Sequence, residues 1–171
     1  MKLTQIDRGT DVGKLISDIG LSDAISTSVM TADVLVVPFG YNDAPYAFPQ
    51  RTDELFQFCQ ENNLKIEILV DDDKYEEIEL NSHVMRLGKF IVKDLVLPLF
   101  ISVLGAYIYE NTRNDFDTDE VVEFVAPTEV EFEMEVIDSL QQRKSMTFKF
   151  KGEAKEFTAA AEEIKKIWDE H

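Results

Sequence analysis

Cysteine, histidine and basic residues are scarce in this chain of 171 residues. Its single cysteine excludes an intramolecular disulfide, and its two histidines exclude a histidine-rich zinc site. Against 34 acidic residues stand only 17 basic ones, so the formal net charge is −17. Because such a surface repels phosphate backbones, nucleic-acid binding is disfavoured. The remaining composition, 44% hydrophobic and 11% aromatic, is that of a globular protein with a sizeable core.

The N-terminal residues lack the apolar run and small-residue cleavage site of a secretory signal, so we expect a cytoplasmic protein. The most apolar stretch of the chain lies at 90–109. From Leu95 to Tyr109 it carries no charge, and a helix of that length spans about 22 Å, less than the hydrocarbon thickness of about 30 Å. A buried core helix is therefore the first interpretation. Contact of residues 90–109 with a membrane, or with a second copy of the chain in a homo-oligomer, is the alternative.

The first half of the chain predicts a βαβ-like unit with a hairpin attached. Valine-rich apolar runs are typical of buried strands, and two of them flank an amphipathic helix with Thr52 at its start. A polar turn and an alternating segment after the second run predict the hairpin. The expected elements are a strand at 2–7, a helix at 10–19, strands at 33–38 and 65–70, a helix at 51–62, a turn at 71–74 and a strand at 75–80.

The centre of the chain predicts helix over residues 83–112. Apolar residues recur along it at three- and four-residue spacing, and Pro98 either starts a second helix or kinks the first. A polar stretch at 111–120 follows and is the best internal boundary, with possible sub-units 1–112 and 113–171. Because the second of these is too short to be stable alone, we expect a single domain spanning residues 1–171.

Strict alternation near the C-terminus predicts an antiparallel hairpin. Apolar residues at 130–136 alternate with glutamates, and Met146, Phe148 and Phe150 alternate with polar residues. Placing both apolar faces on one side sets Val136 opposite Met146, and on the outer face it sets Glu133 opposite Lys149 and Glu131 opposite Lys151. A terminal helix after Gly152 carries an apolar stripe that covers the hairpin. The whole predicts one compact α+β or α/β domain of about six strands and four helices.

The loop from Phe39 to Arg51 is the first candidate site. It leaves a buried strand and enters a helix, where α/β proteins often bind ligands. Its aromatic residues equally suit a protein-binding surface or a small satellite core. The candidate ligand or partner residues are Tyr41, Asn42, Asp43, Tyr46 and Arg51.

No metal site, cofactor or catalytic group is predicted. The carboxylates of Asp71, Asp72, Asp73, Glu76 and Glu77 cluster after a strand, but their spacing matches no metal motif and is typical of a turn. Asp115, Asp117 and Asp119 imitate a calcium loop that fails at Glu120 and Ala126. Cys59 with His83 is the one conceivable thiol dyad, and Cys59 sits on an apolar helix face, where cysteine usually acts as a small hydrophobe.

The acidic field is the last candidate. Residues 114–142 carry ten acidic side chains and no basic one. A concentrated negative face attracts basic partners and speeds their association. The alternative is a solvated strand face whose charge only keeps the protein soluble. The outward glutamates of the hairpin, at Glu129, Glu131, Glu133 and Glu135, form the expected partner face.

Three functions are open, and an enzyme is disfavoured although not excluded. The leading hypothesis is a non-catalytic acidic interaction protein, an adaptor, inhibitor or immunity-type partner, that binds a protein with a basic surface. The alternative is a small-ligand or nucleotide-handling domain that uses the loop 39–51, with Arg51 and the 71–77 carboxylates as polar groups. The third is membrane or self-association through 90–109.

Overall fold

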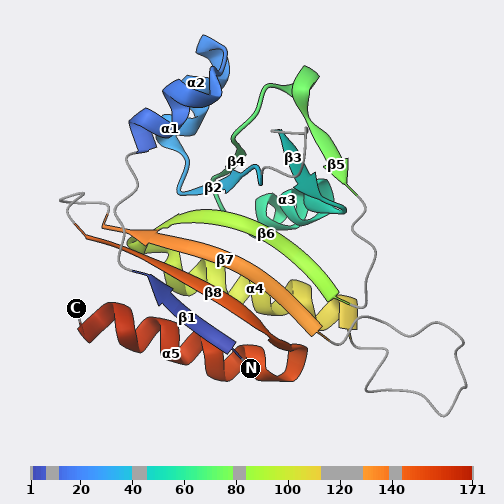
Figure 1. The fold of residues 1–171 in the computed structure, drawn as a ribbon, viewed down its shortest axis with the longest axis vertical. Coiled ribbons are helices and arrows are strands. Elements are labelled where there is room, and N and C mark those ends of the chain that lie inside the picture. The colour runs from blue at the N-terminus through green and yellow to red at the C-terminus, as the bar shows by residue number, and fades with distance from the viewer. Residues whose placement is uncertain are drawn as a thin grey trace, which may run out of the picture.

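A mixed six-stranded sheet forms the centre of the molecule, and helices pack on both of its faces (Figure 1). The computed structural model describes residues 2–6, 12–39, 46–78, 84–112, 129–138 and 144–170. The strand order is β1-β8-β7-β6-β2-β4, and β3 and β5 form a separate two-stranded sheet. The strands are β1 (Lys2–Ile6), β2 (Val34–Val37), β3 (Ala47–Pro49), β4 (Ile66–Ile68), β5 (Glu76–Ile78), β6 (Val84–Lys93), β7 (Glu129–Ile137) and β8 (Ser145–Glu153). The helices are α1 (Val12–Ile19), α2 (Asp23–Thr31), α3 (Thr52–Glu61), α4 (Leu97–Thr112) and α5 (Phe157–Glu170).

The C-terminal hairpin has the predicted register. Val136 pairs with Met146, Glu133 with Lys149 and Glu131 with Lys151. β1 extends the hairpin as an antiparallel neighbour of β8, and β6 extends it as a parallel neighbour of β7. The inner face packs against α5, where Phe157 meets the rings of Phe132 and Phe150 at centroid distances of 5.9 and 6.3 Å. Together these elements confirm a single α+β domain with a terminal helix over the hairpin.

The N-terminal βαβ unit is also formed. β2 and β4 pair in parallel, and α3 lies between them in the chain. The hairpin predicted over 65–80 is wrong, because β5 pairs in parallel with β3 instead of folding back on β4. The Tyr75 ring stacks on Phe48 at 5.2 Å, and the Glu77 carboxylate accepts a hydrogen bond from the Asp53 backbone N–H. Both contacts hold the segment at the start of α3, where a folded-back strand could not make them.

The helix predicted over 83–112 is half wrong, because its first part is β6. Leu87 and Phe90 both reach the main core although they are three residues apart, a spacing that imitates a helix. The cause is a β-bulge, since the pairing of β6 with β7 shifts register between Arg86 and Gly88. The second part is α4, in which Pro98 is the second residue, so this proline starts a helix rather than kinking one.

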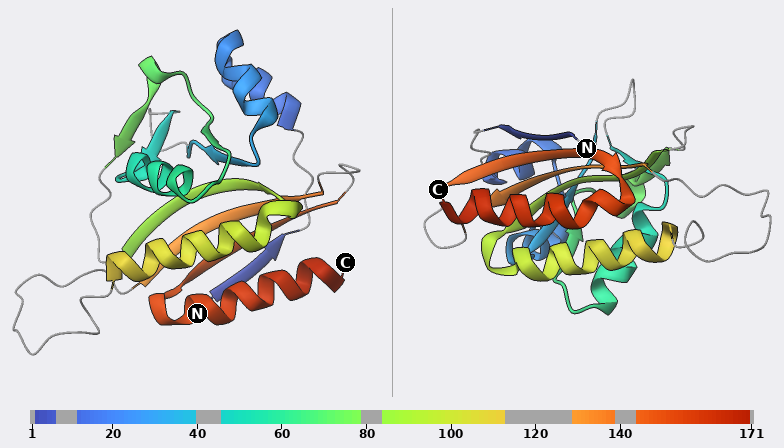
Figure 2. Two further views of the ribbon diagram at one scale, coloured as in Figure 1. Left: turned by 180° about the vertical axis from the view of Figure 1, so that it is seen from behind. Right: turned by 90° about the horizontal axis from the view of Figure 1, so that it is seen from below.

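Helices cover one face of the sheet and leave most of the other face, the open face, uncovered. α4 and α5 lie side by side over one face, which holds the main core (Figure 2). On the opposite face lies α2, which the sequence did not predict. Its Val29, and Ala32 just after its end, pack against Leu35 of β2 and Ile91 of β6. That second cluster covers the β2 and β4 end only. Over β1, β8, β7 and the adjoining part of β6, no helix of the described residues lies on this face.

Candidate functional site

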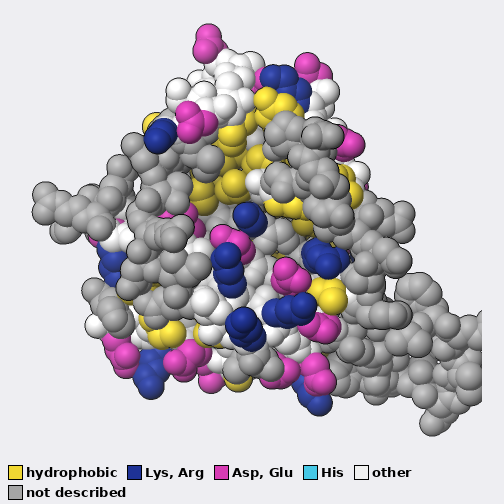
Figure 3. All heavy atoms as spheres, viewed as in Figure 1, with side chains coloured by type: hydrophobic (Ala, Val, Ile, Leu, Met, Phe, Trp, Pro, Cys, Tyr) yellow, Lys and Arg dark blue, Asp and Glu magenta, His cyan; other side chains and the backbone are white. Residues whose placement is uncertain are grey.

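The open face carries charged side chains in rows that follow the strands. Because side chains alternate across a strand, each row consists of the residues between those that fill the core. Figure 3 shows basic and acidic side chains gathered over the middle of this face. The rows are Glu129, Glu131, Glu133 and Glu135 on β7, Arg86, Lys89 and Lys93 on β6, Lys149 and Lys151 on β8, and Lys2 on β1.

The predicted glutamate row is therefore flanked by cations on both sides. Glu133 stands between two lysines, with 3.9 Å from its carboxylate to the Lys89 Nζ and 3.7 Å to the Lys149 Nζ. Glu129 lies 3.8 Å from the Lys151 Nζ. These distances exceed hydrogen-bonding range and the lysines are half exposed, so each pair contributes no more than about 1 kcal/mol. The sequence predicted that the β8 lysines would lie beside the glutamates of β7. It did not predict the cations of β6 on their other side, because β6 was predicted as helix.

The four glutamates differ in their access to solvent. Glu129, Glu131 and Glu133 are half-buried, and no ion pair joins Glu131 to another described residue. Glu135 is buried, with only 8% of its surface exposed. The accessible part of the predicted acidic face is therefore limited to the first three.

A cleft of about 640 Å³ opens among these rows. A volume of this size falls in the range of small-molecule sites. Two residues of the predicted loop, Phe39 and Pro49, also line the cleft. Its lining residues are Lys2, Thr4, Phe39, Pro49, Arg86, Gly88, Lys89, Glu131, Phe132, Glu133, Lys149, Phe150 and Lys151.

Gly88 allows the β-bulge that places the two β6 cations of the cleft, Arg86 and Lys89, on the same face of the sheet. Its φ of +115° belongs to a backbone region that residues with a Cβ rarely adopt, so glycine is required at the bulge. Without the bulge, regular alternation would send Arg86 and Lys89 to opposite faces of the sheet. With it, both occupy the open face, paired in register with Glu131 and Glu133.

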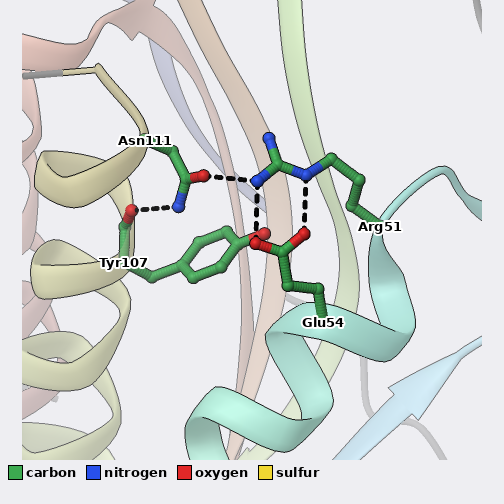
Figure 4. Close-up of polar contacts among 4 residues, drawn as sticks. All are labelled: Arg51, Glu54, Tyr107 and Asn111. Carbon is green, nitrogen blue, oxygen red and sulfur yellow. Dashed lines mark hydrogen bonds and ion pairs between the residues drawn. The ribbon is translucent and has the colours of Figure 1, made fainter. Parts of the chain in front are cut away.

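Arg51, a candidate ligand residue, is engaged within the protein (Figure 4). Its Nε and Nη2 donate to the two carboxylate oxygens of Glu54 at 2.8 Å each, and Nη2 also donates to the Asn111 Oδ1 at 2.5 Å. The Glu54 hydrogen bonds raise the pKa of Arg51, and reciprocally the guanidinium lowers the pKa of Glu54. The cluster joins the start of α3 to the end of α4, beside a second cavity of about 430 Å³ with Glu54, Glu61 and Glu110 in its wall.

The remaining loop candidates are only partly placed. Tyr41, Asn42 and Asp43 lie outside the described residues. Tyr46 is half-buried against the main core, and the Lys74 Nζ stands 5.3 Å from the centre of its ring. Of the aromatic residues in the described part of the loop, Tyr46 and Phe48 thus belong to the main core, whereas Phe39 lines the cleft.

Two of the carboxylates at 71–77, those of Asp71 and Glu77, accept hydrogen bonds from different parts of the protein. Asp71 accepts a hydrogen bond from the Ser22 backbone N–H at 3.0 Å, which lowers its pKa, and Glu77 accepts from Asp53 N–H and from the Tyr75 hydroxyl. Within the described ranges, no three His, Cys, Asp or Glu side chains are grouped so as to hold a metal ion. The acidic residues at 115–123 and His83 lie outside those ranges.

Cys59 is fully buried in the core, and burial raises the pKa of its thiol to about 12. A thiol with that pKa is protonated at neutral pH and is a poor nucleophile. The structure thus places Cys59 as the small core hydrophobe that its helix position indicated.

The apolar segment 90–109 is divided between β6 and α4. Residues Asp94–Thr112 are long and apolar enough to cross a membrane by length and composition, but 44% of that window is buried inside the protein. The exposed side of the segment includes Leu95, Leu99 and Tyr109. Association of this side with a membrane or with a second copy stays a prediction.

The hairpin tip contributes one contact that the sequence did not indicate. The Lys144 Nζ lies 4.0 Å from the centre of the Trp168 ring and donates to the Trp168 carbonyl oxygen at 2.5 Å. Because the charge at Lys144 is used to hold the end of α5, it is a structural contact.

Comparison of the chain with protein-family models, with curated proteins and with solved structures found no match. The class of the protein therefore rests on its fold, a single α+β domain, and its function has to be inferred from the open sheet face.

Proposed function

We propose that this protein is a non-catalytic interaction protein, of the adaptor, inhibitor or immunity type, that acts in the cytoplasm. The observation that carries the proposal is the open face of β1, β8, β7 and β6, on which rows of opposite charge run side by side. Ordered charge rows fix the orientation of a partner and exclude partners with the wrong pattern. A face of this kind is suited to docking a protein.

The partner in this proposal has a basic surface that contacts the β7 glutamates. Glu131 is the natural anchor, because it is half-buried and no described ion pair neutralises it. The net charge of −17 attracts such a partner over long range and speeds association. The lysines on β6 and β8 repel other basic groups. They therefore favour a partner whose basic residues, which contact the β7 glutamates, have acidic residues on either side.

Charge removal on β7 tests this proposal. Proteins that co-purify with the chain from its native cells are identified, and the purified partner is titrated against variants. The triple variant E129Q/E131Q/E133Q is expected to bind at least tenfold more weakly and with a smaller salt dependence, since each exposed charge pair contributes up to about 1 kcal/mol. The matched control E162Q/E163Q/E170Q removes the same charge from the exposed side of α5.

The control is expected to bind as the native chain does. Unchanged affinity of the β7 variant, or an equal loss in both variants, would refute docking on the open face.

A second function is favoured by one specific observation, which is that Phe39 and Pro49 border the same cleft as the lysines. This supports the alternative of a small-ligand domain. In that case the ligand lies over β6 and β8, beside the loop 39–51. Arg51 then supports the loop from within rather than contacting the ligand, since its guanidinium binds Glu54 and Asn111.

A further inference from the structure

We propose that the cleft on the open sheet face binds a small organic anion with two or more negative charges, such as a phosphorylated or polycarboxylate metabolite. This goes beyond the docking of a basic protein, because it requires a ligand of the opposite charge. It gives the small-ligand alternative a site and a ligand class.

The charge of the cleft is opposite to that of the protein around it. The described residues include 14 basic and 25 acidic side chains. Five basic and two acidic ones line the cleft, which leaves nine basic and 23 acidic ones for the rest. A concave site with an excess of positive charge raises the local concentration of anions, whereas the surrounding surface repels them. The contrast therefore focuses an anion on this one place.

The lysines of the cleft are also only partly neutralised. Lys89 and Lys149 share the single carboxylate of Glu133, at distances too long for hydrogen bonds. No ion pair joins Lys2 to a carboxylate of the described residues. Each ammonium group thus keeps donors for a ligand, and lysine acts on phosphate as a compact point charge.

The shape of the cleft favours an anion with an apolar part. Its volume of about 640 Å³ exceeds the needs of a bare inorganic ion, and Phe39 and Pro49 supply an apolar part of its wall. Gly88 lies beside this wall, because a Cβ added there would come within 3.7 Å of the Pro49 ring. An anion whose charged end meets the β8 lysines can lay its apolar part on this wall.

Calorimetric titration with four probes tests the proposal. ATP, ADP, pyrophosphate and citrate are added separately to the native chain at low and at moderate salt. At least one of them is expected to bind with a stoichiometry of one. If ATP binds more tightly than pyrophosphate, the apolar wall contributes; equal affinities would overturn that part of the argument.

Three variants locate the binding. K89Q/K149Q/K151Q is expected to weaken it at least tenfold, and the matched control K65Q/K155Q/K166Q, whose lysines lie outside the cleft, to change it less than twofold. Glu133→Gln is expected to tighten binding severalfold, because it removes a negative charge and frees Lys89 and Lys149. Circular dichroism confirms that each variant is folded.

The Glu133→Gln result separates this proposal from the docking function. A basic partner loses affinity when the β7 row loses charge, whereas an anion in the cleft gains it. Failure of all four probes at millimolar concentration, an equal loss in the control, or weaker binding by Glu133→Gln would overturn the anion site and leave the docking of a basic partner standing.

Discussion

Replacing Arg51 separates two opposing contributions to stability that meet at one residue. Arg51 holds its backbone in the left-handed region, with a φ of 73°, which is unfavourable for any residue with a Cβ. Its guanidinium offsets that strain by binding Glu54 through two hydrogen bonds and Asn111 through one. Arg51→Ala removes the guanidinium and keeps the strain, whereas Arg51→Gly removes both.

The magnitudes follow from the exposure of the groups. Because the Arg51 and Glu54 side chains are 48% and 52% exposed, their pair contributes no more than about 1 kcal/mol. The bond to Asn111 adds about 1 kcal/mol, so Arg51→Ala is expected to lower the free energy of unfolding by about 1.5–2 kcal/mol. Arg51→Gly recovers about 1 kcal/mol of backbone strain and is expected to lose only about 0.5–1 kcal/mol.

Urea unfolding followed by the fluorescence of Trp168, with thermal melts as a second measure, resolves the difference. For a chain of this length, about 1 kcal/mol corresponds to roughly 2–4 °C in Tm. A glycine variant as unstable as the alanine variant would refute the contribution of strain. An alanine variant as stable as the native chain would refute the structural role of the guanidinium and restore Arg51 as a ligand residue.

Three further predictions concern Glu54, Cys59 and Gly88. Hydrogen bonding by Arg51 lowers the folded pKa of Glu54, so its stabilising contribution is present above the ordinary glutamate pKa and is lost as pH falls through the lowered value. Acid titration of stability should therefore show a shallower fall in Glu54→Gln; an identical fall would contradict it. Cys59 should resist a thiol reagent in the folded protein and react at once in urea, and rapid labelling of the native chain would show that its burial is wrong. Gly88→Ala should lose about 1–2 kcal/mol in denaturant unfolding, because alanine is strained at a φ of +115° although nothing lies closer than 3.7 Å to its Cβ; no loss would refute the strain.

The C-terminal hairpin was predictable in detail because one physical rule decides it. Side chains alternate with a period of two, and one face must be apolar, so a slip by one residue would expose Phe132, Met134 and their neighbours. Both strands show that alternation without interruption. The register, the outward glutamates and the covering helix α5 all followed from local sequence.

The strand β6 was not predictable in the same way. Its bulge at Gly88 breaks the alternation, and its later residues are apolar on both faces, since Phe90 fills the main core and Ile91 the second cluster. Over a short window this pattern equals that of a buried helix. Only the tertiary contacts of β6, with β2 and β7 beside it and with the clusters on the two faces of the sheet, decide between strand and helix.

The sequence by itself determined where acidic and basic residues lie along the chain. The tertiary structure decided which of the charged strands lie next to one another. Ten acidic residues without a basic one between 114 and 142 indicate an acidic surface. The structure sets cations from β6, β8 and β1 around the glutamates of β7, so the centre of the open face is basic in a protein that is strongly acidic. Strand order depends on contacts between segments far apart in the chain, and no local pattern of residues contains it.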